Sequence, residues 1–420
     1  MLDIKFIREN PKLVKQGAKN KGVDVDIDRL LEVDKKRRET LQVLEDIKAK
    51  KNKASNDIAR TKDEKEKQKI IFEMRELDKN SDSLNKNFKD IEDEFSETMM
   101  KIPNIPLPDV PVGKNDKDNV VLKNVGEKTK FDFKFKNYME LGENLDLIDI
   151  KRAAKVIGTR FGYLKREAAL LEFALVNLAM EVLTKENFIP VIPPVMLKEE
   201  MARGMGYLEQ TDKEEAYFFP KDNLYLVGTS EQSLGAMHAG EIFEEKDLPK
   251  RYVGFSTCFR RESGSYGKDT KGILRVHQFD KVEMFSFCKK EDSVKEHDFL
   301  LSMEEKLMQA LKIPYQVIKI STGDLGRPAA RKYDIETWLP SENRYRETHS
   351  TSNCTNFQSR RLNIRYRTKE GLEFVHTLNG TAFAIGRTLI AIIENYQQKD
   401  GTIKIPKALQ KYTGFKKIGK

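Results

Sequence analysis

Residues 252–288 read YVGFSTCFRRESGSYGKDTKGILRVHQFDKVEMFSFC, and this stretch decides the fold. It predicts a long β-hairpin, with strands near 252–262 and 273–288 and a glycine-containing loop between them. Because side chains alternate along a strand, one face of the second strand carries a polar and aromatic set: Arg275, His277, Phe279, Lys281 and Glu283. Such a face makes a poor hydrophobic core and a good polar site.

The first strand of this hairpin adds Arg260 and Glu262 on one face. An arginine can hold a phosphate through two parallel hydrogen bonds, and Phe279 can stack on a purine. The alternative is an exposed sheet face crossed by salt bridges, in which His277 is a structural histidine. The hairpin alone does not decide between these readings.

Three further blocks carry candidate site residues. The stretch LYLVGTSE, residues 224–231, predicts a strand that presents Thr229 and Glu231 on one side, where a hydroxyl and a carboxylate suit an ammonium group. In RETHSTSN, Glu347 and Ser350 are hard oxygen ligands suited to magnesium. Arg387 lies in the first turn of a predicted helix, where the helix dipole disfavours a cation and an anionic ligand would explain it.

The composition excludes several classes of protein. With 420 residues, the chain is long enough for two or three domains, and no window approaches the roughly 18 uninterrupted apolar residues of a membrane helix. The N-terminus has no apolar signal core. Three widely spaced cysteines without a CxxC predict a reducing, cytoplasmic location and no zinc site. Neither a Walker A sequence nor GxGxxG is present.

The first hundred residues predict an antiparallel helical hairpin. From Ile70 a 4-3-4-3 spacing forms a heptad seam: Ile70, Met74, Leu77, Ser81, Leu84, Phe88, Ile91, Phe95 and Thr98. Folding the chain back near Glu64 places a looser apolar stripe opposite it: Leu30, Val33, Leu41, Leu44, Ile47, Ala54 and Ile58. Each helix of roughly 35 residues would be about 50 Å long.

The tip of this hairpin is basic. Residues 48–69 hold nine Lys or Arg against four acids, whereas the whole chain has a net charge of +9. The segment contains no aromatic residue, which favours contact with a phosphate backbone over base stacking. The candidates for this contact are Lys48, Lys51, Lys53, Arg60, Lys62 and Lys65. The alternative for the hairpin is a dimerisation or spacer element. The basic tail 399–420 has two interpretations, contact with RNA and solubility.

Four prolines between 103 and 111 end the helical region and mark a linker. We therefore predict an N-terminal arm domain (1–104), a linker (105–130) and a mixed domain (131–420), an α+β fold.

The blocks, taken together and in this order, resemble the class II aminoacyl-tRNA synthetases and, more narrowly, the bacterial type of the seryl-tRNA synthetases. The resemblance rests on KVIGTRFGYLKREAALLEFAL, GTSEQ, CFRRESGSYGKDTKGILRVHQFDKVEMF, RETHSTSNCTNFQSRRLNIRYR, and HTLNG followed by AIGRTLIAIIENYQ. It implies an antiparallel sheet flanked by helices behind a coiled-coil arm, in a homodimer. NFIPVIPPV, with Pro194, would be the motif at the dimer interface.

The resemblance also implies residue roles. The catalytic residues would be Arg260 and Arg387. The serine pocket would consist of Thr229, Ser230, Glu231, Glu283, Asn379 and Thr381. The ATP site would consist of Arg260, Arg261, Glu262, Arg275, Val276, Phe279, Glu347, Thr348, His349, Ser350 and Arg387. Glu347 and Ser350 would hold Mg²⁺, and no zinc is expected.

The implied reaction is the ligation of L-serine to serine tRNA through a seryl-adenylate, without a protein nucleophile. Two departures from the family pattern stand out: Thr381 replaces a common serine, and His349 lies where small residues are usual. The alternatives are a catalytically lapsed paralogue that binds RNA or protein, a homologue that activates another amino acid, and a structural coiled-coil scaffold.

Overall fold

A computed structural model describes residues 1–60, 62–208, 212–263 and 271–419. The chain divides into two compact units. One unit comprises residues 1–19 and 23–103, and the other comprises residues 20–22 and 104–420. Within the described residues, no helix combines the length and the hydropathy that crossing a bilayer requires. The expected loop at 264–270 lies outside the described residues.

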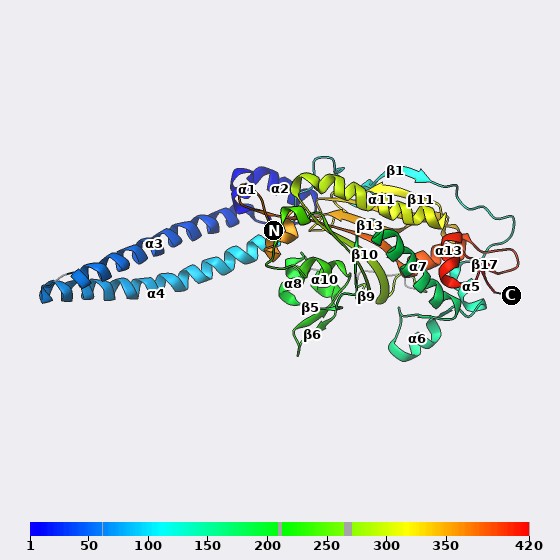
Figure 1. Cartoon of the computed structure of the whole chain (residues 1–420), viewed down its shortest axis with the longest axis horizontal. Helices are drawn as coiled ribbons and strands as arrows, with labels where there is room; N and C mark the ends of the chain where they lie inside the picture. Colours follow the sequence, from blue (N-terminus) through cyan, green and yellow to red (C-terminus); the bar gives the residue numbers. More distant parts are fainter. Residues whose placement is uncertain (61, 209–211, 264–270, 420) are drawn as a thin grey trace. The chain divides into compact units, whose positions relative to one another are not determined.

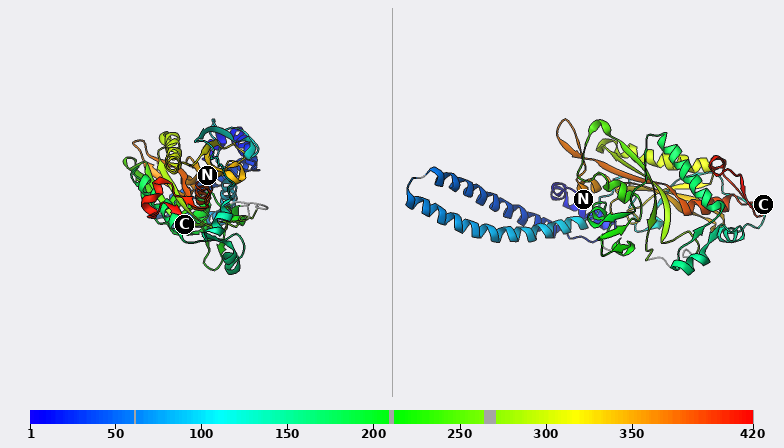
Figure 2. Two further views of the ribbon diagram at one scale, coloured as in Figure 1. Left: turned by 90° about the vertical axis from the view of Figure 1, so that its right-hand side faces the viewer. Right: turned by 60° about the horizontal axis from the view of Figure 1, so that its bottom comes forward.

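The first unit is built around two long antiparallel helices, α3 (Ile27–Arg60) and α4 (Glu64–Lys101), which run side by side in Figures 1 and 2. Two short helices precede them, α1 (Ile4–Glu9) and α2 (Pro11–Asn20). The Asp63 carboxylate accepts a hydrogen bond from the Lys65 backbone and caps α4. The predicted hairpin and its fold-back point are confirmed.

The heptad seam is also confirmed. All nine predicted positions of α4 are half-buried, whereas most of their neighbours are exposed. On α3 the predicted stripe is buried or half-buried except Leu41, which is 36% exposed. Ion pairs fix the register between the helices, since Arg37 Nε lies 2.5 Å from Glu92 Oε2, and Lys51 Nζ lies 2.5 Å from Asp78 Oδ1.

The second unit is organised by an eight-stranded sheet, in the order β1-β11-β12-β13-β16-β10-β9-β4. All its neighbours are antiparallel except β4 and β9. The strands are β1 (Val120–Val125), β4 (Ile189–Val191), β9 (Lys250–Phe259), β10 (Gln278–Cys288), β11 (Tyr315–Lys319), β12 (Arg331–Leu339), β13 (Arg344–Asn353) and β16 (His376–Ala384). Part of the expected linker 105–130 is therefore an edge strand.

Three helices and the sheet share the main hydrophobic core: α7 (Glu167–Thr184), α11 (Ser293–Leu311) and α13 (Ile385–Asn395). Figure 1 shows them together over the sheet. Val282 and Met284 of β10 point into this core and are fully buried. By strand alternation, Phe279, Lys281 and Glu283 point to the opposite face, where the site lies.

Shorter elements complete the unit. The helices are α5 (Tyr138–Asn144), α6 (Ile150–Ile157), α8 (Glu199–Gly204), α9 (Asp212–Glu215), α10 (Glu231–Ala236), α12 (Phe357–Leu362) and α14 (Gln410–Thr413). The strands are β2 (Ile148–Asp149), β3 (Tyr163–Leu164), β5 (Met196–Lys198), β6 (Phe218–Phe219), β7 (Leu224–Leu226), β8 (Ile242–Glu244), β14 (Arg365–Arg367), β15 (Leu372–Phe374), β17 (Ile403–Lys404) and β18 (Lys417–Ile418).

Three strand predictions were wrong in their extent. The first strand of the long hairpin, predicted to run to Glu262, ends at Phe259, so Arg260 and Glu262 follow it. The strand predicted over 224–231 ends at Leu226, and Glu231 is the first residue of α10. The turn between them is held by two hydrogen bonds, from the Gly228 N–H to Gln232 Oε1 and from the Glu231 N–H to the Thr229 hydroxyl. The second strand of the hairpin begins at Gln278, so Arg275 and His277 precede it. The pairing of β9 with β10 is otherwise as predicted.

Candidate active site

Two buried carboxylates lie at one end of the candidate site. The Tyr207 hydroxyl donates a 2.8 Å hydrogen bond to Glu231 Oε2, and Gln358 Nε2 donates one of 3.0 Å to Oε1. Burial, assisted by the negative charge of Glu283, raises the pKa of Glu231 to about 7. A cation placed here would restore the charge of Glu231.

Glu283 is the second carboxylate, and it is 2% exposed. Lys281 Nζ lies 2.9 Å from Glu283 Oε2, and the Thr381 hydroxyl donates to the same oxygen over 3.3 Å. The register between β10 and β16 shifts between Val282 and Glu283, which places Glu283 directly opposite Thr381. The bulge therefore aligns a carboxylate with a hydroxyl on neighbouring strands.

A cavity of about 330 Å³ joins these groups. Its polar walls come from four strands, the start of α10 and two loops: Thr229, Glu231, Arg260, Lys281, Glu283, Lys332, Glu347, Ser350, Asn379 and Thr381. The Thr229 hydroxyl accepts a 3.3 Å hydrogen bond from the Glu231 backbone, so the loop before α10 brings the two side chains together. Ser230 is fully buried, at the N-cap of that helix.

Arginine and an aromatic ring lie next to the carboxylates. The Arg260 guanidinium lies over the Phe279 ring, 5.3 Å from its centroid, and its Nε donates a 3.1 Å hydrogen bond to the Gly228 carbonyl. Arg275 Nη1 lies 3.4 Å from Glu262 Oε2. Glu262 has a left-handed backbone (φ +52°), a strained conformation that often marks functional sites.

Glu347 and Arg387 form an ion pair on the far side of Arg260. Arg387 Nη1 lies 3.3 Å from Glu347 Oε2 and donates a 2.9 Å hydrogen bond to its backbone carbonyl. Burial would raise the pKa of Glu347, but the positive charges of Arg387, Lys332 and Arg260 outweigh it and lower that pKa to about 2. Glu347 is therefore ionised at neutral pH.

Comparisons with known proteins match the whole chain. Residues 1–106 match the family model described as seryl-tRNA synthetase N-terminal domain, and residues 217–396 match the tRNA synthetase class II core domain (G, H, P, S and T). The serine–tRNA ligase of Dictyoglomus turgidum is 45% identical over 100% of this chain and 99% of its own. The chain belongs to the seryl-tRNA synthetase family. It is an aminoacyl-tRNA ligase with a class II core.

Solved structures agree with this assignment. A crystal structure of seryl-tRNA synthetase from Pyrococcus horikoshii, complexed with ATP, superposes with a TM-score of 0.92 at 41% identity, covering 100% of this chain and 99% of that one. The cytoplasmic serine–tRNA ligase of Naegleria fowleri, in complex with AMP, gives 0.87 at 33% identity, covering 100% and 98%. The predicted family, fold class and enzyme class are confirmed.

Of the residues predicted for ATP, His349 and Arg261 do not line the cavities described for this synthetase, whereas the buried Thr348 lines the nucleotide side. His349 is 1% exposed and bonds Thr348 through Nδ1, while the Thr348 hydroxyl contacts Thr337 at 2.6 Å. The Arg261 guanidinium lies over Tyr217, and its Nε donates to the Ala216 carbonyl.

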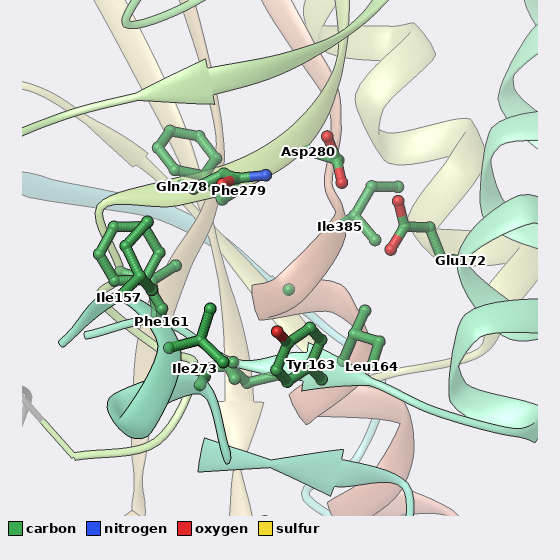
Figure 3. A pocket seen from close by; sticks show the side chains of 15 residues that line it. Ile157, Phe161, Tyr163, Leu164, Glu172, Ile273, Gln278, Phe279, Asp280 and Ile385 are labelled. Atoms are coloured by element: carbon green, nitrogen blue, oxygen red, sulfur yellow. The ribbon is translucent and has the colours of Figure 1, made fainter. Parts of the chain in front are cut away.

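A second cavity, of about 350 Å³, lies behind Phe279 in this synthetase (Figure 3). It shares Ile273, Val276 and Phe279 with the nucleotide side of the site. Figure 3 shows Glu172 of α7 next to Asp280 of β10 at one side of this cavity. Burial and the adjacent Asp280 raise the pKa of Glu172 to about 8, so Glu172 is mostly protonated at neutral pH.

Four site residues were missed by the sequence analysis: Tyr207, Gln358, Lys332 and Asp334. Tyr207 and Gln358 hold Glu231, from segments that no motif joins to it. Lys332 Nζ lies 3.2 Å from Asp334 Oδ2 on β12, and Asp334 lies opposite Ser350 in the register. Only the alternation of charged residues at Lys332, Asp334 and Glu336 in the sequence offered a signal.

Proposed function

We propose that this chain ligates L-serine to serine tRNA in two steps, with the side chains around the 330 Å³ cavity in the roles given below. The observation that carries this proposal is that two cavities adjoin through Arg260, Lys281, Glu347 and Thr381: buried carboxylates line the larger one, and arginines beside an aromatic ring line the other. Serine carries an ammonium group and a carboxylate, and ATP carries phosphates and a purine. The two cavities complement these substrates in charge and in shape.

The serine ammonium would lie between Glu231 and Glu283, with Thr229 and Asn379 beside it. The serine hydroxyl would bond to the Thr381–Glu283 pair. Alanine would leave these buried polar groups without a partner, and that is how such a site rejects a substrate without the hydroxyl. Thr381 keeps the hydroxyl that a serine would supply, and its extra methyl group narrows the pocket.

ATP would lie toward the other cavity. Phe279 would stack on the adenine, with Val276 beside it and Glu262 accepting from its amino group. Arg260 and Arg387 would hold phosphate oxygens, and Arg275 would exchange its pairing with Glu262 for a phosphate contact. The P. horikoshii relative, with ATP bound and a TM-score of 0.92, supports a nucleotide site in this fold.

Glu347 and Ser350 fit a magnesium ion as a pair. A low pKa keeps Glu347 ionised, the Ser350 hydroxyl lines the same cavity, and both are hard oxygen donors. Magnesium sites usually take one or two protein ligands and complete their octahedron with phosphate oxygens and water. When bound, the ion would neutralise phosphate charge and orient the phosphates.

In the first step, the serine carboxylate oxygen attacks the α-phosphorus and pyrophosphate leaves. In the second step, the terminal ribose hydroxyl of the tRNA attacks the acyl carbon and AMP leaves. Neither step needs a protein nucleophile, because the carboxylate is already ionised. The protein contributes position and charge: Arg260 next to the phosphorus, and Glu231 and Glu283 on the ammonium.

The hairpin tip would follow the phosphate backbone of the tRNA. Five of the six candidate cations are exposed, whereas Lys51 is paired with Asp78 and half-buried. We therefore assign the backbone contact to the other five: Lys48, Lys53, Arg60, Lys62 and Lys65. Phosphate contacts of this kind are weakened by salt.

Exposed apolar side chains support the expected homodimer. Leu170 and Phe173 of α7 are 51% and 60% exposed, and Ile189 and Ile192 are 47% and 87% exposed. Ile189 and Ile192 belong to the stretch that resembles the dimer motif of class II synthetases. A second copy of the chain would cover all four side chains.

The test of this function is ATP–pyrophosphate exchange with magnesium and without tRNA, comparing serine, threonine, alanine and no amino acid. We expect exchange with serine only. Exchange with threonine or alanine instead would keep the chemistry and reject the pocket. No exchange by a folded protein would favour the lapsed RNA-binding paralogue.

A further inference from the structure

The loop between β11 and β12, residues 320–330, forms a wall of the 330 Å³ cavity to which the proposed function gives no role. Five of its residues line the cavity: Asp324, Gly326, Arg327, Pro328 and Ala329. Residues 320–330 are all described, and none of them lines the nucleotide side. The position of this loop therefore affects the shape of the serine pocket and not that of the ATP site.

Lys21 holds this loop through three hydrogen bonds. Its ammonium group donates to the carbonyls of Ala329 at 2.6 Å, Gly326 at 3.0 Å and Arg327 at 3.2 Å. An ammonium group has three N–H donors, so each carbonyl can accept one of them. Lys21 is buried and does not itself line the cavity. It belongs to the second unit, although it lies between α2 and α3 in the chain.

Hydrophobic packing does not explain a lysine at this position. Burial lowers the pKa of Lys21 to about 7, because it disfavours the charged form. No carboxylate of the described residues forms an ion pair with Lys21, and a buried charge without such a partner is costly. A methionine would fill a similar volume without this cost. What the lysine adds is its set of bonds to the three loop carbonyls.

Asn104 fixes the same loop from a second point. Its side-chain amide donates to the Pro328 carbonyl at 2.9 Å and to the Cys354 carbonyl at 2.8 Å, and its backbone N–H donates to the Arg327 carbonyl at 2.9 Å. Cys354 also lines the cavity. The segment Gly326–Ala329 is thus held by Lys21 and Asn104 together.

Pro328 connects the loop to Glu231. A Cβ atom built on Gly206 would lie 3.2 Å from Pro328 Cβ, so the loop packs closely against the backbone of Gly206, whose φ is +94°. The next residue is Tyr207, and its hydroxyl donates to Glu231 in the serine pocket. A shift of the loop would therefore displace Gly206 and Tyr207 and weaken the hydrogen bond to Glu231.

We propose that Lys21 is a positioning residue of the serine pocket. Its three bonds hold Pro328 against Gly206, and this contact places the Tyr207 hydroxyl on Glu231. The proposal rests on the proposed function and adds to it a residue that lies outside the cavity and touches neither substrate. Loss of the Lys21 ammonium weakens the binding of serine and leaves the binding of ATP unchanged.

The experiment measures KM for serine and KM for ATP in ATP–pyrophosphate exchange by the full-length protein. Lys21→Met removes the three donors and nearly keeps the length of the side chain. We expect KM for serine to rise about tenfold or more, the lower end of the effect of losing a hydrogen bond to a charged group. We expect KM for ATP to stay within about twofold of the wild type, because the loop does not reach the nucleotide side.

The matched control is Arg251→Met, which removes another cation from the second unit. Arg251 donates two 2.7 Å hydrogen bonds to the buried Glu296 and lines none of the cavities described above. Its loss destabilises the unit without reaching the serine pocket. Both KM values should therefore stay as in the wild type.

A double variant tests the route through Tyr207. Tyr207→Phe removes the hydroxyl that Lys21 is proposed to place. If Lys21 acts through this hydroxyl, the two effects are not independent. The KM for serine of the variant with both substitutions should then lie within about twofold of that of Tyr207→Phe alone, instead of equalling the product of the two effects.

Every other outcome with a folded protein overturns the proposal. An unchanged KM for serine in Lys21→Met would remove Lys21 from the pocket, and an equal rise of KM for ATP or an equal effect of Arg251→Met would reveal general destabilisation. Multiplying effects in the double variant would reject the route through Tyr207. If Lys21→Met does not fold, Lys21→Gln, which is too short to bond all three carbonyls, repeats the comparison. Absence of exchange in the wild type would instead reject the proposed function itself.

Discussion

Glu231→Gln tests the electrostatics of the serine pocket most directly. The pKa of Glu231 is raised from 4.5 to about 7, because burial and the neighbouring Glu283 disfavour its ionised form. A carboxyl with a raised pKa binds its proton more tightly in the folded state than in the unfolded one. Its effect on stability is therefore favourable at low pH, and it is lost as the pH rises from 4.5 through 7.

The magnitude follows from these two pKa values. The pKa of Glu231 is 4.5 in the unfolded state and about 7 in the folded state. This difference lowers the free energy of unfolding by about 1.4 kcal/mol at pH 5.5 and by about 3 kcal/mol at pH 8. Glutamine does not titrate. We expect the free energy of unfolding of Glu231→Gln, minus that of the wild type, to rise by about 2 kcal/mol between these pH values.

Other effects of the substitution cancel in this comparison. The new amide can turn its oxygen toward Gln358 Nε2 and its NH2 toward the Tyr207 hydroxyl, which accepts as well as donates, and any change in hydrogen-bond strength is the same at every pH. Glu283, Lys281 and Tyr207, which face the same space, are present in both proteins. Only the dependence on pH reports the ionisation of Glu231.

The assay is urea denaturation followed by the fluorescence of Trp338. This is the only tryptophan in the chain, and it is buried in the second unit.

Serine affinity gives a second measurement. If the ammonium needs ionised Glu231, wild-type affinity should rise about tenfold per pH unit below 7 and level off above it. A stability difference that is the same at pH 5.5 and 8 would refute this reasoning.

The site and the surface support four further predictions. Arg260→Ala should abolish serine-dependent exchange while its stability in urea changes little. Arg261→Ala removes a guanidinium that lies over Tyr217, and its exchange rate should fall by less than about tenfold. Thr381→Val should lower kcat/KM for serine about 10- to 100-fold by removing the hydrogen bond to Glu283, with KM for ATP unchanged. Deleting residues 30–98 should spare exchange and abolish tRNA charging; normal charging would remove the arm from the mechanism. Phe173→Glu should give monomers in sedimentation, and Phe72→Glu, an equally exposed position on α4, should not.

Periodic patterns predicted the fold well, because burial follows periodicity. The nine-position seam of α4 could be read from spacing alone, as could the alternation that puts Phe279, Lys281 and Glu283 on one face. The segment 224–231 could not be read in this way. Its apolar start suggests a strand, but Gly228 and the buried hydroxyl of Thr229 turn the chain into a helix whose burial depends on distant elements.

Site residues without a motif were missed for a related reason. Tyr207 and Gln358 reach Glu231 from positions 24 residues before and 127 residues after it. Neither spacing reflects a local period, so only the packed structure joins them. Arg261 is the opposite case. The motif predicted that Arg261 contacts ATP, but its Nε donates to the Ala216 carbonyl and its guanidinium lies over Tyr217.

The pairing of charges explains how so polar a cavity can fold without its substrates. Buried charges are costly unless each has a partner. Here the buried pair Lys281–Glu283 meets this condition, and the more exposed groups assigned to the substrates are also paired, as in Glu347–Arg387 and Glu262–Arg275. Binding would then exchange these partners for an ammonium group, a carboxylate and phosphates, instead of bringing charges into an uncompensated site. Glu231 is the exception: its hydrogen-bond donors are neutral, and its pKa is raised. It follows that Glu231 gains most from the serine ammonium, and that serine binding should release a proton from Glu231 near pH 7.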